Sequence, residues 1–407
     1  MLSELRWLHW ECCPSNFVAA NFHPKQLVVL DLSRSEIPEE WGGWGPIKMV
    51  TKLKVLNLSS CPHLKRTPNL TVFESLEILI LEECENLEEI HPSIGDNKSL
   101  ISLNVNGCRR VEELPIGVDR LEELKELLIN DTAIQAIPMS EKGLMKLETL
   151  NASCCGRLEE LPAGVGIMEN LRELLINDIG IQEIPISKGG LSKLETLCAS
   201  HCEALAQLPE SIYSVVSLTQ LDLSHSGIEE LPESMLNLGS LTRLDLSYTW
   251  IEKLSEHLGF PCFLTQLDLS HSGIREFPKF KAYSLTQLDL SHIGIEELPK
   301  STHSLEGLTH LNLSYVGIKT LPESMGSLKP LQHLLLQGCY LLRHLPHSII
   351  WLKSLTELDL QSTGVAVLPH DMQNLKNLKI LDIRGTDITR LPNQFNFALH
   401  DHDISWE

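Results

Sequence analysis

The 407-residue chain carries 54 acidic and 33 basic side chains, which gives it a formal net charge of -21 at pH 7. Proteins that bind DNA or RNA use Lys and Arg to neutralise phosphates, so this balance argues against a nucleic acid partner and favours a basic protein surface. The opening residues carry no basic segment before a long apolar core, and no later apolar run approaches membrane length, so we expect neither secretion nor a membrane span.

One motif recurs along the whole chain. The stretch Leu218–Ile228, which reads Leu-Thr-Gln-Leu-Asp-Leu-Ser-His-Ser-Gly-Ile, returns unchanged at Leu264–Ile274. Its Leu-x-x-Leu-x-Leu frame can be started seventeen times, mostly 23 or 24 residues apart, which is the signature of leucine-rich repeats. The copies begin at Leu5, Leu27, Leu53, Leu76, Leu100, Leu124, Leu147, Leu171, Leu194, Leu218, Leu241, Leu264, Leu285, Leu308, Leu331, Leu355 and Leu378.

Each copy predicts a short strand, a turn and a return segment. The leucines at positions one, four and six of the frame point into the stack, while positions three, five and seven alternate outward. The recurrent Leu-Pro, as in Leu231-Pro232, suits a loop that leaves the strand layer and begins a helical turn on the other side. We therefore predict an α/β leucine-rich-repeat solenoid, curved like a horseshoe, with parallel strands on its concave face and loops with short helical turns on its convex face.

The repeats run without a linker, so we expect one domain over residues 1–407, built from about 17 repeats. An irregular insertion lies near residues 38–50, where Trp41-Gly-Gly-Trp44-Gly45-Pro46 lengthens one repeat. Neither end carries the polar cap that covers the last hydrophobic layer of a solenoid. We therefore expect the chain to be a fragment of a larger protein or the product of a truncated gene.

Cysteine recurs at position nine of the frame, where other copies place Ser or Thr. A small side chain is needed there because the residue turns inward just after the strand, and free cysteine behaves as a small buried hydrophobe. We therefore expect reduced, slowly reacting thiols, and we expect Cys198, at outward position five, to react first with a thiol reagent. The position-nine cysteines are Cys13, Cys61, Cys84, Cys108, Cys155, Cys202 and Cys339.

The first hundred residues carry a more specific resemblance. The segments Leu5–Trp10, Asn21–Pro24, Leu27–Ser33, Leu53–Leu58 and His91–Gly95 resemble the start of the repeat region in plant intracellular immune receptors that join a TIR domain, a nucleotide-binding domain and leucine-rich repeats. The resemblance implies that the repeats sense a pathogen effector or a host protein and restrain the receptor's own nucleotide-binding domain. It also implies a cytoplasmic or nuclear location.

Motifs for chemistry are missing from the chain. There is no Gly-x-x-x-x-Gly-Lys-Ser/Thr phosphate loop, so we expect the nucleotide-binding switch of such receptors not to be in this chain, and the TIR domain is missing too. Acidic pairs such as Glu229-Glu230 recur at one repeat position, which indicates solvated loops. The tail His400-Asp-His402-Asp lacks the further ligands of a metal site. We therefore predict no enzyme activity, no cofactor and no bound metal.

The candidate binding residues lie in three rows on the outward face of the ninth to fourteenth copies. These rows have two possible explanations. In the first, the copies are nearly identical only because they were duplicated recently. In the second, the rows form an acidic strip, rich in imidazole, that binds the Lys or Arg side chains of a partner. The residues are Gln220, Arg243, Gln266, Gln287 and His310 at position three; Asp222, Asp245, Asp268 and Asp289 at position five; and His225, Tyr248, His271, His292 and Tyr315 at position eight.

A second function stays open, that of a stand-alone intracellular leucine-rich-repeat scaffold that binds a small GTPase or another signalling protein. Repeats of that group have a similar Leu-Pro frame at 23 residues, but they prefer Asn at position nine, where this chain has Cys, Ser and Thr. An extracellular receptor is disfavoured because no secretory segment and no Gly-x-Ile-Pro loop occurs.

Overall fold

A computed structural model describes residues 4–17, 24–47, 49–140, 142–254, 263–277, 283–301 and 305–391. The tail with His400 and His402, the segment Asn21–His23 of the resemblance, and Cys262 lie outside the described residues. The chain divides into two compact units. Unit 1 comprises Met1–Leu205 with Ser214–Leu218, and unit 2 comprises Ala206–Tyr213 with Thr219–Glu407.

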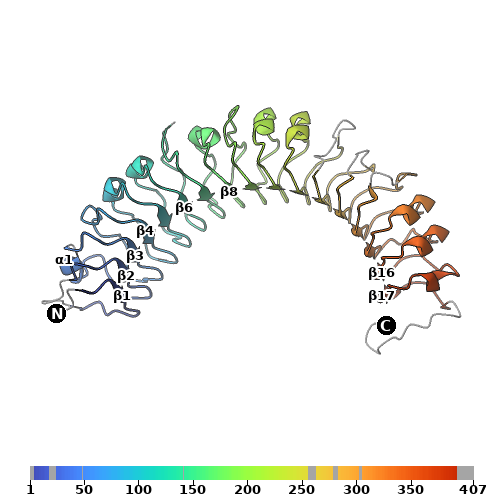
Figure 1. Cartoon of the computed structure of the whole chain (residues 1–407), viewed down its shortest axis with the longest axis horizontal. Helices are drawn as coiled ribbons and strands as arrows, with labels where there is room; N and C mark the ends of the chain where they lie inside the picture. Colours follow the sequence, from blue (N-terminus) through green and yellow to red (C-terminus); the bar gives the residue numbers. More distant parts are fainter. Residues whose placement is uncertain are drawn as a thin grey trace. The chain divides into compact units, whose positions relative to one another are not determined.

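Unit 1 is a stack of parallel strands, each hydrogen-bonded to the next in chain order. For example, Leu30 lies opposite Leu56 and both are 0% exposed, so the position-four leucines of these successive repeats form one buried row. The strands lie side by side on one side of the stack, and the short helices of the connecting segments lie on the opposite side (Figure 1). The strands are β1 (Trp7–His9), β2 (Val29–Asp31), β3 (Val55–Asn57), β4 (Ile78–Ile80), β5 (Ser102–Asn104), β6 (Glu126–Leu128), β7 (Thr149–Asn151), β8 (Glu173–Leu175) and β9 (Thr196–Cys198).

Unit 2 repeats the same arrangement. Leu244 lies opposite Leu267, and Leu267 lies opposite Leu288, all in parallel register. The strands are β10 (Gln220–Asp222), β11 (Arg243–Asp245), β12 (Gln266–Asp268), β13 (Gln287–Asp289), β14 (His310–Asn312), β15 (His333–Leu335), β16 (Glu357–Asp359) and β17 (Ile380–Asp382).

The strand positions confirm the predicted frame. Each described strand covers positions three to five of one predicted copy. The inward leucines of the copy at Leu264 are only 1% exposed at Leu264, 2% at Leu267 and 0% at Leu269. Burial of these leucines drives the stacking, because every repeat covers the apolar layer of its neighbour. The α/β leucine-rich-repeat solenoid is therefore confirmed.

Short 3-10 helices follow many of the Leu-Pro pairs on the side away from the strands. Proline suits this place, because its φ is fixed near the helical value and the first turn does not need its amide. Pro232, for example, has φ -65° and directly precedes the 3-10 helix Glu233–Asn237. The described 3-10 helices are η1 (Pro92–Asp96), η2 (Ile116–Arg120), η3 (Ala163–Ile167), η4 (Glu210–Ser214), η5 (Glu233–Asn237), η7 (Glu323–Ser327), η8 (His347–Trp351) and η9 (Met372–Asn374).

The predicted insertion near residues 38–50 forms an aromatic cluster and the short helix α1 (Trp44–Ile47). Trp41 and Trp44 are buried and meet edge to face, with 5.2 Å between ring centroids. Phe17 stacks on Trp41 at 5.8 Å. The insertion therefore adds apolar packing to one end of unit 1.

Cysteine and serine at position nine both donate to backbone carbonyls, as two copies illustrate. The thiol of Cys108 donates to the carbonyl of Leu81 in the preceding repeat, with 3.0 Å between Sγ and O. The hydroxyl of Ser226 instead donates to Leu223 of its own repeat, at 2.6 Å. The seven position-nine cysteines are fully buried free thiols. Burial raises the pKa of the Cys339 thiol to about 11.

The exposures of the remaining cysteines correct one expectation. Cys12 and Cys154 are exposed, whereas Cys198 is only partly exposed. Both exposed thiols lie at position eight, where the backbone turns with positive φ and directs the side chain away from the core. We therefore expect Cys12 and Cys154, and not Cys198, to react first.

Within the described part of the chain, no helix is long and apolar enough to cross a membrane.

Candidate protein-binding face of unit 2

The predicted rows lie on the sheet face of unit 2. Positions three and five stand within β10 to β14, and position eight stands in the turn after each strand. Parallel register brings equal positions side by side, as with Asp245 beside Asp268 and Gln266 beside Gln287. The three rows are therefore contiguous in space.

The aspartate ladder, which we define as Asp222, Asp245, Asp268 and Asp289, closes the turns that follow the strands. One oxygen of each carboxylate accepts the backbone N–H of the serine two residues later, at 2.8 to 3.0 Å. This is an Asx-type turn, which an asparagine forms equally well. Asn312 in the next repeat accepts the amide of Ser314 at 3.0 Å. The repeated aspartate thus has a structural role of its own.

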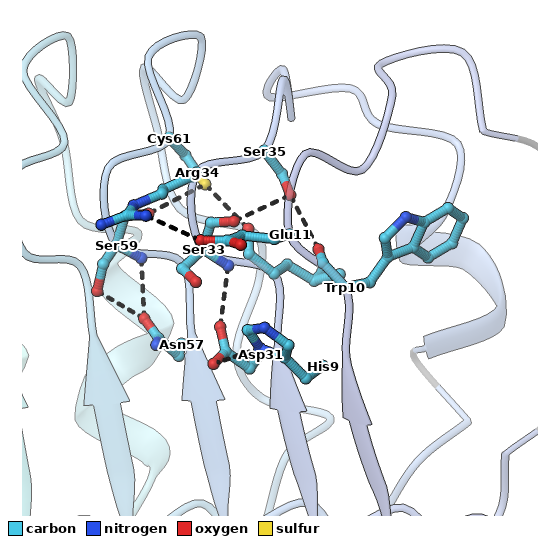
Figure 2. Close-up of polar contacts among 11 residues, drawn as sticks. His9, Trp10, Glu11, Asp31, Ser33, Arg34, Ser35, Asn57, Ser59 and Cys61 are labelled. Carbon is cyan, nitrogen blue, oxygen red and sulfur yellow. Dashed lines mark hydrogen bonds and ion pairs between the residues drawn. The ribbon is translucent and has the colours of Figure 1, made fainter.

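The same turn occurs in unit 1, where the bonds can be followed directly (Figure 2). Asp31 accepts the amide of Ser33, and Asn57 accepts the amide of Ser59, both at 3.0 Å. His9 of the adjacent strand also pairs with Asp31, with 2.9 Å between Nδ1 and Oδ2. Unit 1 therefore shows that the second oxygen of such a carboxylate is available to a neighbouring donor.

In unit 2 that second oxygen, Oδ2, lacks a hydrogen-bond donor at Asp245 and Asp268, among the described residues. The side-chain amide of Asn312 donates to Oδ2 of Asp289, with 2.8 Å between Nδ2 and Oδ2. No described Lys or Arg forms an ion pair with the aspartate ladder. Burial, with added repulsion from Asp289 and Asp245, raises the pKa of Asp268 to about 6.

The ring ladder, which we define as His225, Tyr248, His271, His292 and Tyr315, runs beside the aspartate ladder. Successive rings stack nearly parallel, with centroids 4.0 to 4.4 Å apart and interplanar angles of 10 to 20°. Tyr248 and Tyr315 remain 45% and 48% exposed, so the ring edges face solvent. Stacked aromatic faces with exposed polar edges form a rigid surface suited to contact with a partner.

Each ring of this ladder sits on a left-handed backbone, with φ between 55 and 60°. Such a backbone costs about 1 kcal/mol for a residue other than Gly, Asn or Asp. Position eight of the next repeat is Gly338, with φ 71°, and a Cβ there would lie 2.5 Å from Cδ1 of Tyr315. The ring of Tyr315 therefore covers the glycine, and the ring ladder ends there.

Two further histidines end the position-three row. The rings of His310 and His333 stack with 4.3 Å between centroids. Nδ1 of His333 lies 2.7 Å from Oε2 of Glu357, and Nδ1 of His310 lies 2.8 Å from the hydroxyl of Thr309. Burial and the nearby His333 lower the pKa of His310. At neutral pH the His310 ring is therefore mainly uncharged imidazole.

A groove of about 300 Å³ lies on this face across β11 to β15. It brings together most of the position-three and position-five residues that the sequence predicts, but Gln220 and Asp222 do not line it. His333 and Leu335 line it and were missed by the sequence reasoning, although they hold positions three and five of the copy at Leu331. The polar and charged lining is Arg243, Asp245, Gln266, Asp268, Gln287, Asp289, His310, Asn312 and His333.

One expectation about this face is wrong. Position seven was expected to point outward, but Ser247, Ser270, Ser291 and Ser314 are each only 7 or 8% exposed. Their backbone amides bind the position-five side chains, which draws the turn inward over the strand ends.

The described residues also contain no group of three His, Cys, Asp or Glu placed to hold a metal ion.

Comparison with known proteins matches the repeats to two family models. One, described as a leucine-rich repeat region, matches residues 52–203, and the other, a leucine rich repeat, matches residues 283–341. The disease resistance protein RRS1 of Arabidopsis thaliana is 30% identical over 141 residues, which cover 34% of this chain and 10% of RRS1. The disease resistance protein RPP4 of the same plant is 32% identical over 124 residues, covering 30% of this chain and 10% of RPP4. The matched part is thus about a tenth of each relative.

Solved structures show the same fold. A leucine-rich-repeat protein of Leptospira interrogans is 26% identical with a TM-score of 0.69, covering 90% of this chain and 86% of that protein. The plant peptide hormone receptor RGFR1, solved in complex with RGF2, is 24% identical with a TM-score of 0.60, covering 83% of this chain and 60% of the receptor chain.

Proposed function

We propose that this chain, a leucine-rich-repeat region similar to those of plant disease resistance proteins, binds a basic protein partner on the sheet face of unit 2. The observation that carries the proposal is the unpaired charge of the aspartate ladder: Asp245 and Asp268 line the groove with one oxygen committed to the turn and one without a donor among the described residues. Lys or Arg from a partner would supply that donor and offset the negative charge.

The partner that fits best is a pathogen effector or a host protein that such an effector modifies. In a full-length receptor, the repeat region would also contact the nucleotide-binding domain and hold it inactive until the partner binds. Similarity to disease resistance proteins supports both parts of this proposal. A binding and regulatory role also fits the repeat fold, since solenoids present long continuous surfaces.

The binding face can be tested with substitutions that keep its shape. In the triple variant Asp245→Asn, Asp268→Asn and Asp289→Asn, each turn keeps its acceptor, as Asn312 already shows. Asp359→Asn is the matched control, because Asp359 closes the same kind of turn, at 2.8 Å from the amide of Gln361, but does not line the groove.

We expect proteins captured by the parent to be captured by the Asp359→Asn control and lost from the triple variant. Association with a captured partner should also become slower and less dependent on salt. If the triple variant keeps the same partner with the same rate and salt dependence, the ladder serves only the turns and the proposal fails. The scaffold alternative gains support if a small GTPase is captured by all three proteins.

A further inference from the structure

The groove has two side-chain amides that no other group on this face uses. Gln266 and Gln287 lie directly opposite each other in the parallel register of β12 and β13, and both line the groove. Neither side chain has a hydrogen-bond partner among the described residues. A glutamine amide offers a donor and an acceptor together, which is the same pair of groups that a peptide unit presents.

We infer that the groove binds an extended peptide segment with two basic side chains, whose backbone pairs with the amides of Gln266 and Gln287. This inference rests on the proposed function and specifies the partner's contacting segment. An amide pairs with any peptide backbone in extended form, whereas the surface of a folded helix has its backbone groups already satisfied. The glutamine pair therefore favours a strand-like or disordered segment of the partner.

The length of the groove sets the length of the segment. From β11 to β15 there are four steps between strands, each about 4.8 Å, so the groove spans about 19 Å. An extended chain advances about 3.3 Å per residue, so roughly six residues cover that span. Side chains of alternate residues point to one side, about 6.6 Å apart.

The charges set where the basic residues lie. Arg243 stands at the β11 end beside Asp245 and repels a cation, so the two basic side chains are placed over Asp268, whose Oδ2 has no donor among the described residues, and over Asp289, whose carboxylate can accept a further hydrogen bond beside that from Asn312. Alternate residues of the segment match this placement within the reach of flexible Lys or Arg side chains. The next residue on the same side falls near Leu335 at the β15 end, which is partly exposed and apolar. The predicted pattern is basic, any, basic, any, apolar, in either chain direction.

The experiment begins with a library of random hexapeptides displayed on phage and selected on the whole chain. Enriched sequences are synthesised with a fluorescent label, and their dissociation constants are measured by anisotropy. A well-folded basic protein, hen lysozyme, serves as the probe for binding that needs only positive charge. We expect enrichment of the predicted pattern and at least tenfold weaker binding of a peptide with both basic residues replaced by Gln.

The decisive variant is Gln266→Glu with Gln287→Glu. It adds two negative charges, so if charge alone attracts the peptide, binding becomes tighter. If the amide donors hold the backbone, binding becomes weaker, and we expect a loss of about fivefold or more in affinity. Gln220→Glu is the matched control, because Gln220 holds the same position on β10 but does not line the groove.

The possible outcomes separate this inference from the proposed function. Tighter binding by the double variant, or enrichment of peptides without the basic pair, overturns the extended-peptide inference. The same holds if no peptide is enriched on the parent above the triple asparagine variant. If lysozyme binds the parent and loses affinity in the triple variant while peptides do not bind, the basic-partner proposal stands and the inference falls. If neither the peptides nor lysozyme bind the triple variant more weakly than the parent, both the proposed function and the extended-peptide inference are wrong.

Discussion

The ring of Tyr248 lies against the ring of His271, with 4.0 Å between centroids and 10° between planes. On its other face Tyr248 stacks on His225, also at 4.0 Å. The ladder is thus continuous, although each rung pays about 1 kcal/mol for its left-handed backbone. Each stacking contact contributes about 0.5 to 1.5 kcal/mol. A ring at an end of the ladder has one such contact, which nearly offsets the backbone strain. An inner ring such as Tyr248 has two, and together they outweigh the strain.

Replacing an inner rung should therefore destabilise unit 2. Tyr248→Asn keeps a residue that tolerates left-handed φ but removes two stacking contacts, and we expect a loss of about 1 kcal/mol in the free energy of unfolding. Tyr248→Phe keeps the ring and is the control, with an expected change near zero. Urea unfolding followed by circular dichroism measures both. Equal stability of the Asn variant and the parent would show that the rings stack without stabilising the fold.

The half-buried Asp268 gives unit 2 an unusual dependence on pH. The pKa of Asp268 is raised to about 6 in the folded chain, above its unfolded value, so the folded state holds this proton more tightly. Stability from this group is present below the unfolded pKa and is lost as pH rises through 6. Asp268→Asn removes the charge and keeps the turn acceptor. We expect it to raise stability by about 1 to 3 kcal/mol at pH 7.5.

That gain should shrink below pH 6 and vanish near pH 4, where the parent carboxyl is also neutral. Urea unfolding of both proteins across this range measures the difference. A gain that does not change with pH would mean that Asp268 is ionised normally in the folded chain.

Acidification should weaken binding of a basic partner. Between pH 7.5 and 5.5 Asp268 takes up a proton, which removes a negative charge from the groove. His271 does not offset this change at neutral pH, because burial and the nearby His292 and His225 lower its pKa more than Asp289 raises it. Anisotropy with a basic hexapeptide probe should show several-fold weaker binding at pH 5.5. The triple asparagine variant should lose the part of this pH dependence that comes from Asp268, and an unchanged pH profile would contradict the assignment.

The inward leucines can be tested at Leu267, which is 2% exposed. Leu267→Asp buries a carboxylate without a partner and removes a leucine from the stack, so we expect a loss of several kcal/mol. Gln287→Asp introduces the same charge at an exposed position of the next strand and should change stability by less than about 0.5 kcal/mol. Circular dichroism melts compare the two. An unchanged transition in Leu267→Asp would show that the register is wrong.

Thiol reactivity should follow exposure. Cys12 and Cys154 should be alkylated first by iodoacetamide in the native protein, followed by Cys198, because a buried thiol is both shielded and harder to ionise. Cys155, which adjoins Cys154, is the internal control: it is fully buried, and burial raises its pKa. Peptide mass spectrometry at increasing times gives the order. Rapid alkylation of Cys155 or Cys108 would contradict the buried assignment.

The sequence by itself determined the repeat and its core. Leucines at positions one, four and six recur at nearly constant spacing, and only a stack of parallel strands buries all of them at once, so Leu264 and Leu267 could be assigned to the core from the pattern alone. The same period placed the candidate residues in rows. The inward place of the position-nine cysteines followed from their exchange with Ser and Thr.

Only the tertiary structure decided what the rows do. Whether Asp268 is a turn acceptor, a free charge or both depends on the path of the backbone after β12, and the outcome is that Oδ1 binds the amide of Ser270 while Oδ2 has no donor among the described residues. Ring stacking depends on a left-handed turn that these copies signal only weakly, because Tyr is a poor candidate for positive φ, although His is one of the residue types enriched there. The groove that joins Gln266 and Gln287 to Leu335 exists because neighbouring strands bring residues some 20 to 70 positions apart within reach of one ligand. Periodicity gives the order of such rows, but hydrogen bonding and packing between repeats decide which atoms remain free to bind.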